Sequence, residues 1–205
     1  MSGRRMAFLL IAYLAMALAA IGLGAWLERP VPVRHPSPIL QLGWSAPLVS
    51  LALGLAVAAI TIGSTRVLLE RARWARALRR ELKILVEGAS GAQLVLLAVA
   101  SGLAEELFFR GALQPAAGLV TTSVLFGALH VGPRREFLPW TAWALVMGLV
   151  LGGVYELTGA LEGPVIAHVL VNAVNLRVIA RHDARLDPGD GRLPPPKLVA
   201  RVRRQ

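Results

Sequence analysis

Long apolar runs set the strongest limit on what this chain can fold into. Met6 to Leu27 is a charge-free run of about 22 residues, which at about 1.5 Å per residue crosses a hydrocarbon core of about 30 Å. Ile39 to Thr65 is a second run of the same kind. Because 56% of the 205 residues are hydrophobic and these runs exceed what a soluble core needs, the sequence predicts an integral membrane protein.

Further helices follow the first two runs. They are predicted at Ala89 to Arg110, Leu119 to Val131, Phe137 to Tyr155 and Pro164 to Ala180. The second of these is too short to span a membrane, and we expect it to be buried among the others. Arg66 to Glu87 interleaves seven Lys or Arg residues with apolar residues at helical spacing, which favours a membrane-surface helix over a partner-binding helix. The predicted fold is an all-α polytopic bundle of about six transmembrane helices with a basic amphipathic surface helix.

Three regions divide the chain. Residues 1–88 hold two transmembrane helices and the cytoplasmic amphipathic helix, residues 89–180 form the predicted catalytic core, and residues 181–205 are a basic, proline-rich tail with too few apolar residues to fold. Ala17-Leu18-Ala19 resembles a signal-peptide cleavage site, so a cleaved first segment is the competing interpretation. The apolar run continues past that site, which favours a retained span.

The net charge of +10 follows membrane topology. With the N-terminus inside, 19 of the 22 basic residues fall in segments on the inner side, which predicts a multi-pass protein with both termini cytoplasmic, in a bacterial inner or plasma membrane. We expect the surface helix and the tail to contact anionic lipid headgroups, and we do not expect nucleic acid to bind. The chain has no cysteine, which excludes disulfides and thiolate catalysis.

Charged residues interrupt the apolar core at one place. Glu105 and Glu106 end an uncharged stretch, and Arg110 follows one turn later. A charge inside hydrocarbon costs at least ~2.5 to 3.5 kcal/mol, so these groups are expected to face a polar interior and to mark function. Glu106 and Arg110 share a helix face and should pair, whereas Glu105 is rotated by about 100° and is left to act as a base or a metal ligand.

Two later apolar stretches carry histidines. His130 follows Phe126 by four residues, and His168 precedes Asn172 by four. A buried histidine near a carboxylate can share a water with it, and hydrogen-bond donors converging in a dry site are what an oxyanion intermediate needs. The competing interpretation is that these polar groups only join helices together, but that role does not require so many ionisable groups in one place.

These residues form three motifs that resemble those of one family. Glu-Glu-x-x-x-Arg, Phe-x-x-x-His and His-x-x-x-Asn occur in that order between about Ser101 and Asn175. They are similar to the motifs of the CPBP intramembrane proteases, the CAAX prenyl protease type II and bacteriocin-processing group, also called the Abi family. The resemblance implies an intramembrane endopeptidase acting on a membrane-associated protein or peptide, by CAAX-type, bacteriocin-type or C-terminal sorting-signal processing.

The resemblance also implies a role for each residue. Glu105 and His130 would activate a water, and His168 and Asn172 would hold the oxyanion. Residues with a supporting role would be Glu106, Arg110 and Phe126. The family has been described both as metal-dependent and as glutamate-dependent, so a divalent metal such as zinc on Glu105, His130 and His168 stays open, although the sequence lacks a His-Glu-x-x-His helix.

Two functions from other classes remain as alternatives. A non-enzymatic immunity or scaffold protein would keep the fold and use the site only for binding, so that Glu105→Gln would leave its phenotype intact. A proton-coupled transporter also needs buried carboxylates and histidines, but six short helices without an inverted repeat argue against it.

Overall fold

The computed structural model describes residues 1–28 and 33–181, and the predicted tail, including residues 182–205, therefore lies outside the described residues. The α-helices are α1 Gly3–Trp26, α2 Ala46–Arg71, α3 Arg73–Val86, α4 Gly91–Glu106, α5 Gln114–Ala117, α6 Leu119–Ala128, α7 Leu138–Thr158 and α8 Glu162–Arg181. A π-helix at Leu107–Leu113 joins α4 to α5, and short 3₁₀ turns lie at Gly43–Ser45 and Arg135–Phe137. The prediction of an all-α fold is confirmed.

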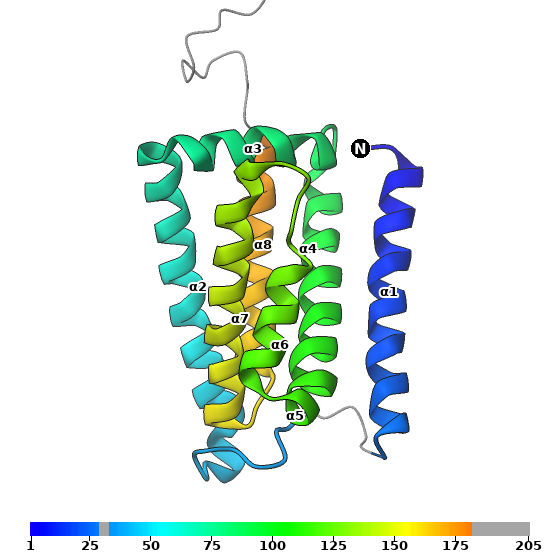
Figure 1. Cartoon of the computed structure of the whole chain (residues 1–205), viewed down its shortest axis with the longest axis vertical. Coiled ribbons are helices and arrows are strands. Elements are labelled where there is room, and N and C mark those ends of the chain that lie inside the picture. The colour runs from blue at the N-terminus through cyan, green and yellow to red at the C-terminus, as the bar shows by residue number, and fades with distance from the viewer. Residues whose placement is uncertain (29–32, 182–205) are drawn as a thin grey trace, which may run out of the picture.

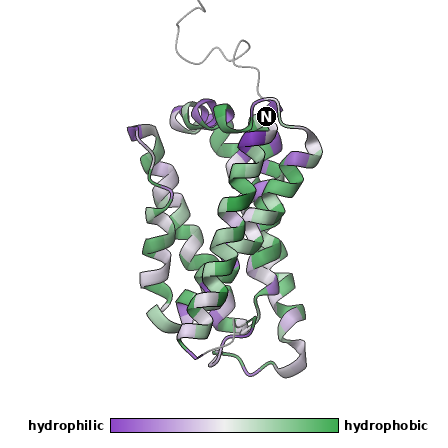
Figure 2. Cartoon of the chain, turned by 90° about the vertical axis from the view of Figure 1, so that its right-hand side faces the viewer, coloured by the Kyte–Doolittle hydropathy of each residue, from purple (hydrophilic) through white to green (hydrophobic). Residues whose placement is uncertain are grey.

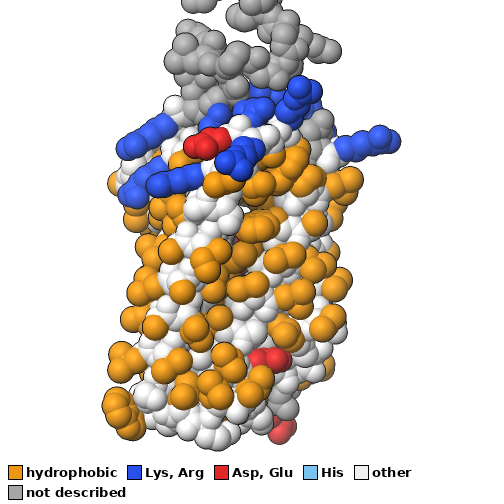
Figure 3. Space-filling view, turned by 90° about the vertical axis from the view of Figure 1, so that its left-hand side faces the viewer, with side chains coloured by type: hydrophobic (Ala, Val, Ile, Leu, Met, Phe, Trp, Pro, Cys, Tyr) orange, Lys and Arg blue, Asp and Glu red, His pale blue; other side chains and the backbone are white. Residues whose placement is uncertain are grey.

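Within the described residues, five helical segments are long and apolar enough to cross a membrane. They are Gly3–Trp26, Gly43–Arg71, Gly91–Ala117, Leu138–Thr158 and Glu162–Arg181. The outward faces are apolar: Phe8 is 71% exposed and Ile60 is 69% exposed, and Figure 3 shows hydrophobic side chains over the sides of the bundle. Such a surface is stable against lipid tails and confirms the polytopic membrane bundle.

The surface helix α3 lies across one end of the bundle (Figure 1). Figure 2 shows hydrophilic residues at that end and in the loops at the opposite end, with mainly hydrophobic helix shafts between them. The predicted boundary between span and surface helix was wrong: α2 continues to Arg71, and α3 begins only at Arg73. Val67, Leu68 and Leu69 extend the apolar helix, and Ala72, with an extended backbone of φ −104° and ψ 122°, makes the turn.

We expected the short helix α6 to be buried among the others, and that prediction was wrong. It packs along α7 on one side, while Val120, Val124 and Leu129 on its other side are 48% exposed or more. Figure 1 shows α6 starting near α5 and ending part-way up the bundle, from where a non-helical connector runs to the α3 end. Irregular backbone at this depth is tolerated where it lines a cavity.

Direct helix contacts join the N-terminal region to the predicted core. α2 packs along α8, α1 packs along α4 and the π-helix, and α4 packs along α8. A Cβ added at Gly102 of α4 would lie 2.6 Å from the Val169 Cγ2 atom of α8. The regions 1–88 and 89–180 therefore form one bundle, in which α4 and α8 approach closely.

Candidate active site

The carboxylates lie where α4 changes its winding. We expected a regular helix to Arg110, but the chain becomes a π-helix at Leu107, directly after Glu105 and Glu106. Short π-helical segments inside α-helices are frequent at functional sites. The Arg110 Nη1 atom still donates to Glu106 Oε1 at 3.1 Å, so the predicted ion pair is present. Its two side chains are 0% and 1% exposed, which makes this a fully buried ion pair.

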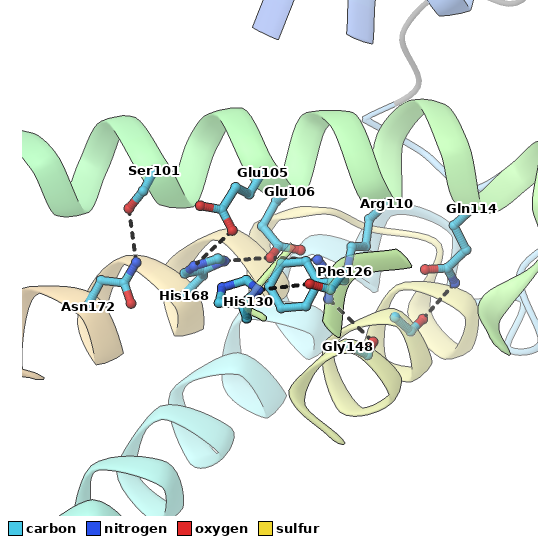
Figure 4. A network of polar contacts seen from close by, with 11 residues as sticks. Ser101, Glu105, Glu106, Arg110, Gln114, Phe126, His130, Gly148, His168 and Asn172 are labelled. Atoms are coloured by element: carbon cyan, nitrogen blue, oxygen red, sulfur yellow. Dashed lines mark hydrogen bonds and ion pairs between the residues drawn. The ribbon is translucent and has the colours of Figure 1, made fainter. Parts of the chain in front are cut away.

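Glu106 also contacts His168, a contact that sequence reasoning missed. The same Oε1 atom lies 2.7 Å from His168 Nδ1 (Figure 4). A carboxylate paired with arginine is ionised and can only accept, so Nδ1 carries the hydrogen. The ring is thereby oriented with its Nε2 atom toward Glu105, 3.9 Å from Oε2. Glu106 Oε1 thus accepts hydrogen bonds from both Arg110 and His168.

His130 is held by its own helix. Its Nδ1 atom lies 2.8 Å from the Phe126 carbonyl oxygen, one turn earlier. A carbonyl only accepts hydrogen bonds, so Nδ1 is the donor and the lone pair of the neutral ring is on Nε2. The Phe126 ring packs against His130 at 4.8 Å between centroids and lies 4.6 Å from the Arg110 Cζ atom. Phe126 therefore separates and supports both side chains.

Asn172 is bonded to a residue outside the predicted set. Its Nδ2 atom donates to Ser101 Oγ at 2.9 Å, joining α8 to α4 (Figure 4). An amide nitrogen carries two hydrogens, so this bond engages one and leaves the second for another acceptor. Ser101 stands one turn before Glu105 on the same helix face, and that spacing is the only sequence signal for it.

A single cavity of about 550 Å³ brings the predicted residues together. Glu105, His130, His168 and Asn172 all line it, while the three residues with predicted supporting roles are at most 4% exposed. From His168 the cavity follows α8 as far as Ile179, which is about 16 Å at the rise of a helix. At that end its walls come from α3 and are mainly apolar, including Trp74, Leu78 and Leu82.

Residues 88–174 match the family described as Rce1-like, type II CAAX prenyl endopeptidase. The match covers less than half of the chain, and we call these residues the Rce1-like segment. "Uncharacterized protein YpbD" of Bacillus subtilis (strain 168) is 36% identical over 99 residues, covering 47% of this chain and 51% of that protein. The chain thus spans about half the length of this relative. No solved structure was found to match. The predicted resemblance is confirmed over the Rce1-like segment.

Two side chains in the Rce1-like segment join the π-helix and α5 to α7. Arg110 Nη2 donates to the Gly148 carbonyl at 3.3 Å, and Gln114 Nε2 donates to the Gly152 carbonyl at 3.0 Å. The two helices α6 and α7 pack closely at Gly148, since a Cβ added there would lie 3.0 Å from the Cα atom of Ser123. Gln114 was missed, although it continues the spacing of four residues from Glu106 and Arg110.

The sequence left open a zinc ion on the three residues Glu105, His130 and His168. Glu105, His130 and His168 share the cavity, but across residues 1–28 and 33–181 no three His, Cys, Asp or Glu side chains are arranged to hold an ion. A catalytic zinc needs three protein ligands converging on one point. The side chains of Glu105, His130 and His168 do not converge in this way, so their arrangement does not fit a catalytic zinc.

Proposed function

We propose that this protein is an intramembrane endopeptidase that hydrolyses a peptide bond of a membrane-associated protein or peptide. The observation that carries the proposal is the shared cavity of Glu105, His130, His168 and Asn172 inside a bundle of membrane-length helices. Ionisable groups gathered in an intramembrane cavity are costly unless they serve a function. The similarity of residues 88–174 to a family described as type II CAAX prenyl endopeptidases supports the same conclusion.

The first step is the activation of a water by Glu105 and His130. Because His130 donates Nδ1–H to the Phe126 carbonyl, its Nε2 lone pair accepts a hydrogen bond from the water. Glu105, 12% exposed beside the cavity, takes the proton as the water oxygen attacks the scissile carbonyl carbon. The resulting tetrahedral intermediate collapses as the same proton passes to the leaving nitrogen, which breaks the C–N bond and gives a free carboxylic acid, which keeps the second hydrogen of the water, and a free amine.

The second step is stabilisation of the oxyanion by Asn172 and His168. The second hydrogen on Asn172 Nδ2 is free of the Ser101 bond and serves as one donor. The Nδ1–H group of His168 already donates its hydrogen bond to Glu106 Oε1. The oxyanion is therefore bound by Nε2–H, which is present when the ring is doubly protonated. One preorganised donor of this kind typically contributes about 10²- to 10³-fold to the rate.

The shape of the cavity suggests how a substrate reaches these groups. It runs from the site to the underside of α3, the end that the positive charges predict to be cytoplasmic. Its largely apolar walls suit a hydrophobic segment that leaves the bilayer beside α3. We propose that the basic residues of α3 bind anionic headgroups there and keep the helix at the interface. CAAX-type, bacteriocin-type and C-terminal sorting-signal substrates all satisfy this description.

The test compares protein N- and C-termini in membrane and surface fractions of host cells. Cells carry the wild-type protein, Glu105→Gln or Glu162→Gln at equal abundance. The Glu162 side chain is 42% exposed and pairs with Arg34 away from the cavity, so its variant is a matched control. We expect some termini to disappear with Glu105→Gln and to remain with Glu162→Gln. Identical termini in all three strains would contradict the proposal and favour a non-enzymatic immunity or scaffold protein.

A further inference from the structure

His130 lies two residues beyond the end of α6, whereas Glu105, His168 and Asn172 lie within helices. The His130 amide nitrogen still donates to the Gly127 carbonyl at 2.9 Å, and a non-helical connector follows. The carbonyl groups at a helix C-terminus receive no donor from the helix itself, so their partners must come from elsewhere. The position of His130 therefore depends on contacts with other parts of the bundle.

α7 lies along α6 in a constant register that reaches as far as His130. Contacting residues follow one another at intervals of three or four along both helices, in opposite directions, as expected for two antiparallel helix faces. The closeness of the contact is clear at Gly127, where an added Cβ would lie 2.9 Å from Leu145 Cβ. In order along α6, the pairs are Leu119 with Gly152, Ser123 with Gly148, Gly127 with Leu145, and His130 with Thr141.

Thr141 is the residue of α7 that holds the backbone of His130. Its hydroxyl donates to the His130 carbonyl oxygen at 2.9 Å, and the Phe137 carbonyl oxygen lies 3.2 Å from the same Oγ1 atom. A hydroxyl has one hydrogen, so the two carbonyls compete for it, and the shorter distance favours His130. A contact with the carbonyl four residues earlier is usual for threonine in a helix, whereas the contact with His130 joins two helices. Thr141 thereby caps the end of α6 from a neighbouring helix.

The adjacent residue Trp140 packs against the His130 ring. The two ring centroids are 5.1 Å apart and the ring planes meet at 88°, the edge-to-face arrangement that aromatic pairs favour. The Phe126 ring is also in contact, and the Phe126 carbonyl accepts from His130 Nδ1. Consecutive residues of α7 thus contact the backbone and the ring of His130, and Trp140 lines the cavity beside it.

We infer that Thr141 is a positioning residue, whose hydroxyl fixes the end of α6 so that His130 and Glu105 can share one water. Thr141 belongs to none of the three sequence motifs. Misplacement of a reacting group by about 1 Å can lower a rate about 10²-fold, so the end of α6 must be held to within that length. This inference rests on the proposed function for its effect on catalysis, whereas the contact itself can be measured without a substrate.

The contact is tested by NMR on the full chain in detergent micelles, labelled with ¹³C-carbonyl histidine and ¹⁵N-valine. Histidine is followed by valine only at His130-Val131 and His168-Val169, so a spectrum that correlates carbonyl carbons with the next amide contains two signals. Val131→Ile removes one of them and thereby assigns both. Because a hydrogen bond deshields a carbonyl carbon, Thr141→Val should move the His130 carbonyl signal upfield and leave the His168 signal in place.

Two matched variants complete this measurement. Thr141→Ser keeps the hydroxyl and should leave the His130 signal close to its wild-type position. Thr121→Val makes the same change at an exposed threonine of α6 and should move neither signal. A His130 signal that coincides in wild type and Thr141→Val overturns the inference, because the hydroxyl would then serve the Phe137 carbonyl alone. Movement of both signals also overturns it, because the hydroxyl would then support the whole bundle rather than His130.

The effect on catalysis is tested with a quenched fluorescent peptide that ends in a prenylated CAAX sequence. We expect Thr141→Val to lower kcat about 10- to 100-fold with KM unchanged, and Thr141→Ser to keep most of the wild-type kcat. In His130→Ala the further change Thr141→Val should cost nothing, because the side chain it positions is gone. An additive loss, an unchanged kcat in Thr141→Val or a change confined to KM contradicts the positioning role. Failure of the wild-type protein to cleave would count against the proposed function, while the NMR result would still decide the contact.

Discussion

The buried pair of Glu106 and Arg110 allows a stability prediction that separates charge from packing. In Arg110→Met the aliphatic part of the side chain is kept, and the guanidinium is lost. Three interactions disappear with it: the bond to Glu106 Oε1 at 3.1 Å, the bond to the Gly148 carbonyl at 3.3 Å, and the contact over the Phe126 ring at 4.6 Å. Glu106, at 0% exposure, is left as a buried charge without its counterion.

The magnitude follows from that uncompensated charge. Breaking a buried ion pair by removing one partner costs roughly 3–5 kcal/mol, whereas removing both charges is often nearly neutral. At roughly 2–4 °C per kcal/mol for a chain of this size, the melting temperature should fall by about 6 to 20 °C. Glu106→Gln alone should cost about as much, because it strands Arg110. The double variant should recover to within about 1–2 kcal/mol of the wild type.

Reversible unfolding in mixed detergent and SDS micelles measures these free energies. Tryptophan fluorescence is a suitable signal, since Trp140 and Trp143 line the cavity. The double-mutant cycle should give a coupling energy of at least about 2 kcal/mol. A loss below about 1 kcal/mol in Arg110→Met, or additive losses in the double variant, would refute the view that these two charges stabilise each other.

Two further changes test the packing around the site. Gly102→Ala would place a Cβ 2.6 Å from Val169 Cγ2 and 3.1 Å from the Val169 nitrogen, so α4 and α8 must separate beside His168. In unfolding and cleavage assays we expect the free energy of unfolding to fall by about 1–3 kcal/mol and kcat to fall roughly tenfold. Gly153→Ala is the control and should change neither, because a Cβ added there meets nothing within 4 Å. Gln114→Leu removes only the bond to the Gly152 carbonyl, and we expect about 0.5–1.5 kcal/mol less stability at unchanged kcat; a lost kcat would place Gln114 in the chemistry instead.

Contacts within one helix could be predicted because helical geometry sets which residues meet. Residues four apart lie on one face, and on that basis the Glu106–Arg110 pair was expected and is present. The same spacing brings the Phe126 carbonyl to His130 Nδ1. The π-helix after Glu106 was missed, because hydrophobic periodicity over seven residues does not distinguish a π-helix from an α-helix.

Helix placement was the less predictable part of the fold. The length of α6 showed that it cannot span a membrane, but not that it lies at the edge of the bundle against α7. An apolar helix that faces lipid and one that faces other helices can have the same mean hydropathy, since lipid tails are as apolar as the side chains of a protein core. Burial of a membrane helix therefore depends on its neighbours.

The sequence by itself determined that the chain is a helical membrane bundle and which ionisable residues lie in it, because the length of apolar runs and the cost of buried charge are local properties. Only the tertiary structure decided which of those residues meet. Glu106 and His168 are 62 residues apart, and Ser101 and Asn172 are 71 apart. Periodicity gives the face of a helix but not the helix that it contacts, so the joining of Ser101 to Asn172 became visible only when α4 and α8 were packed together.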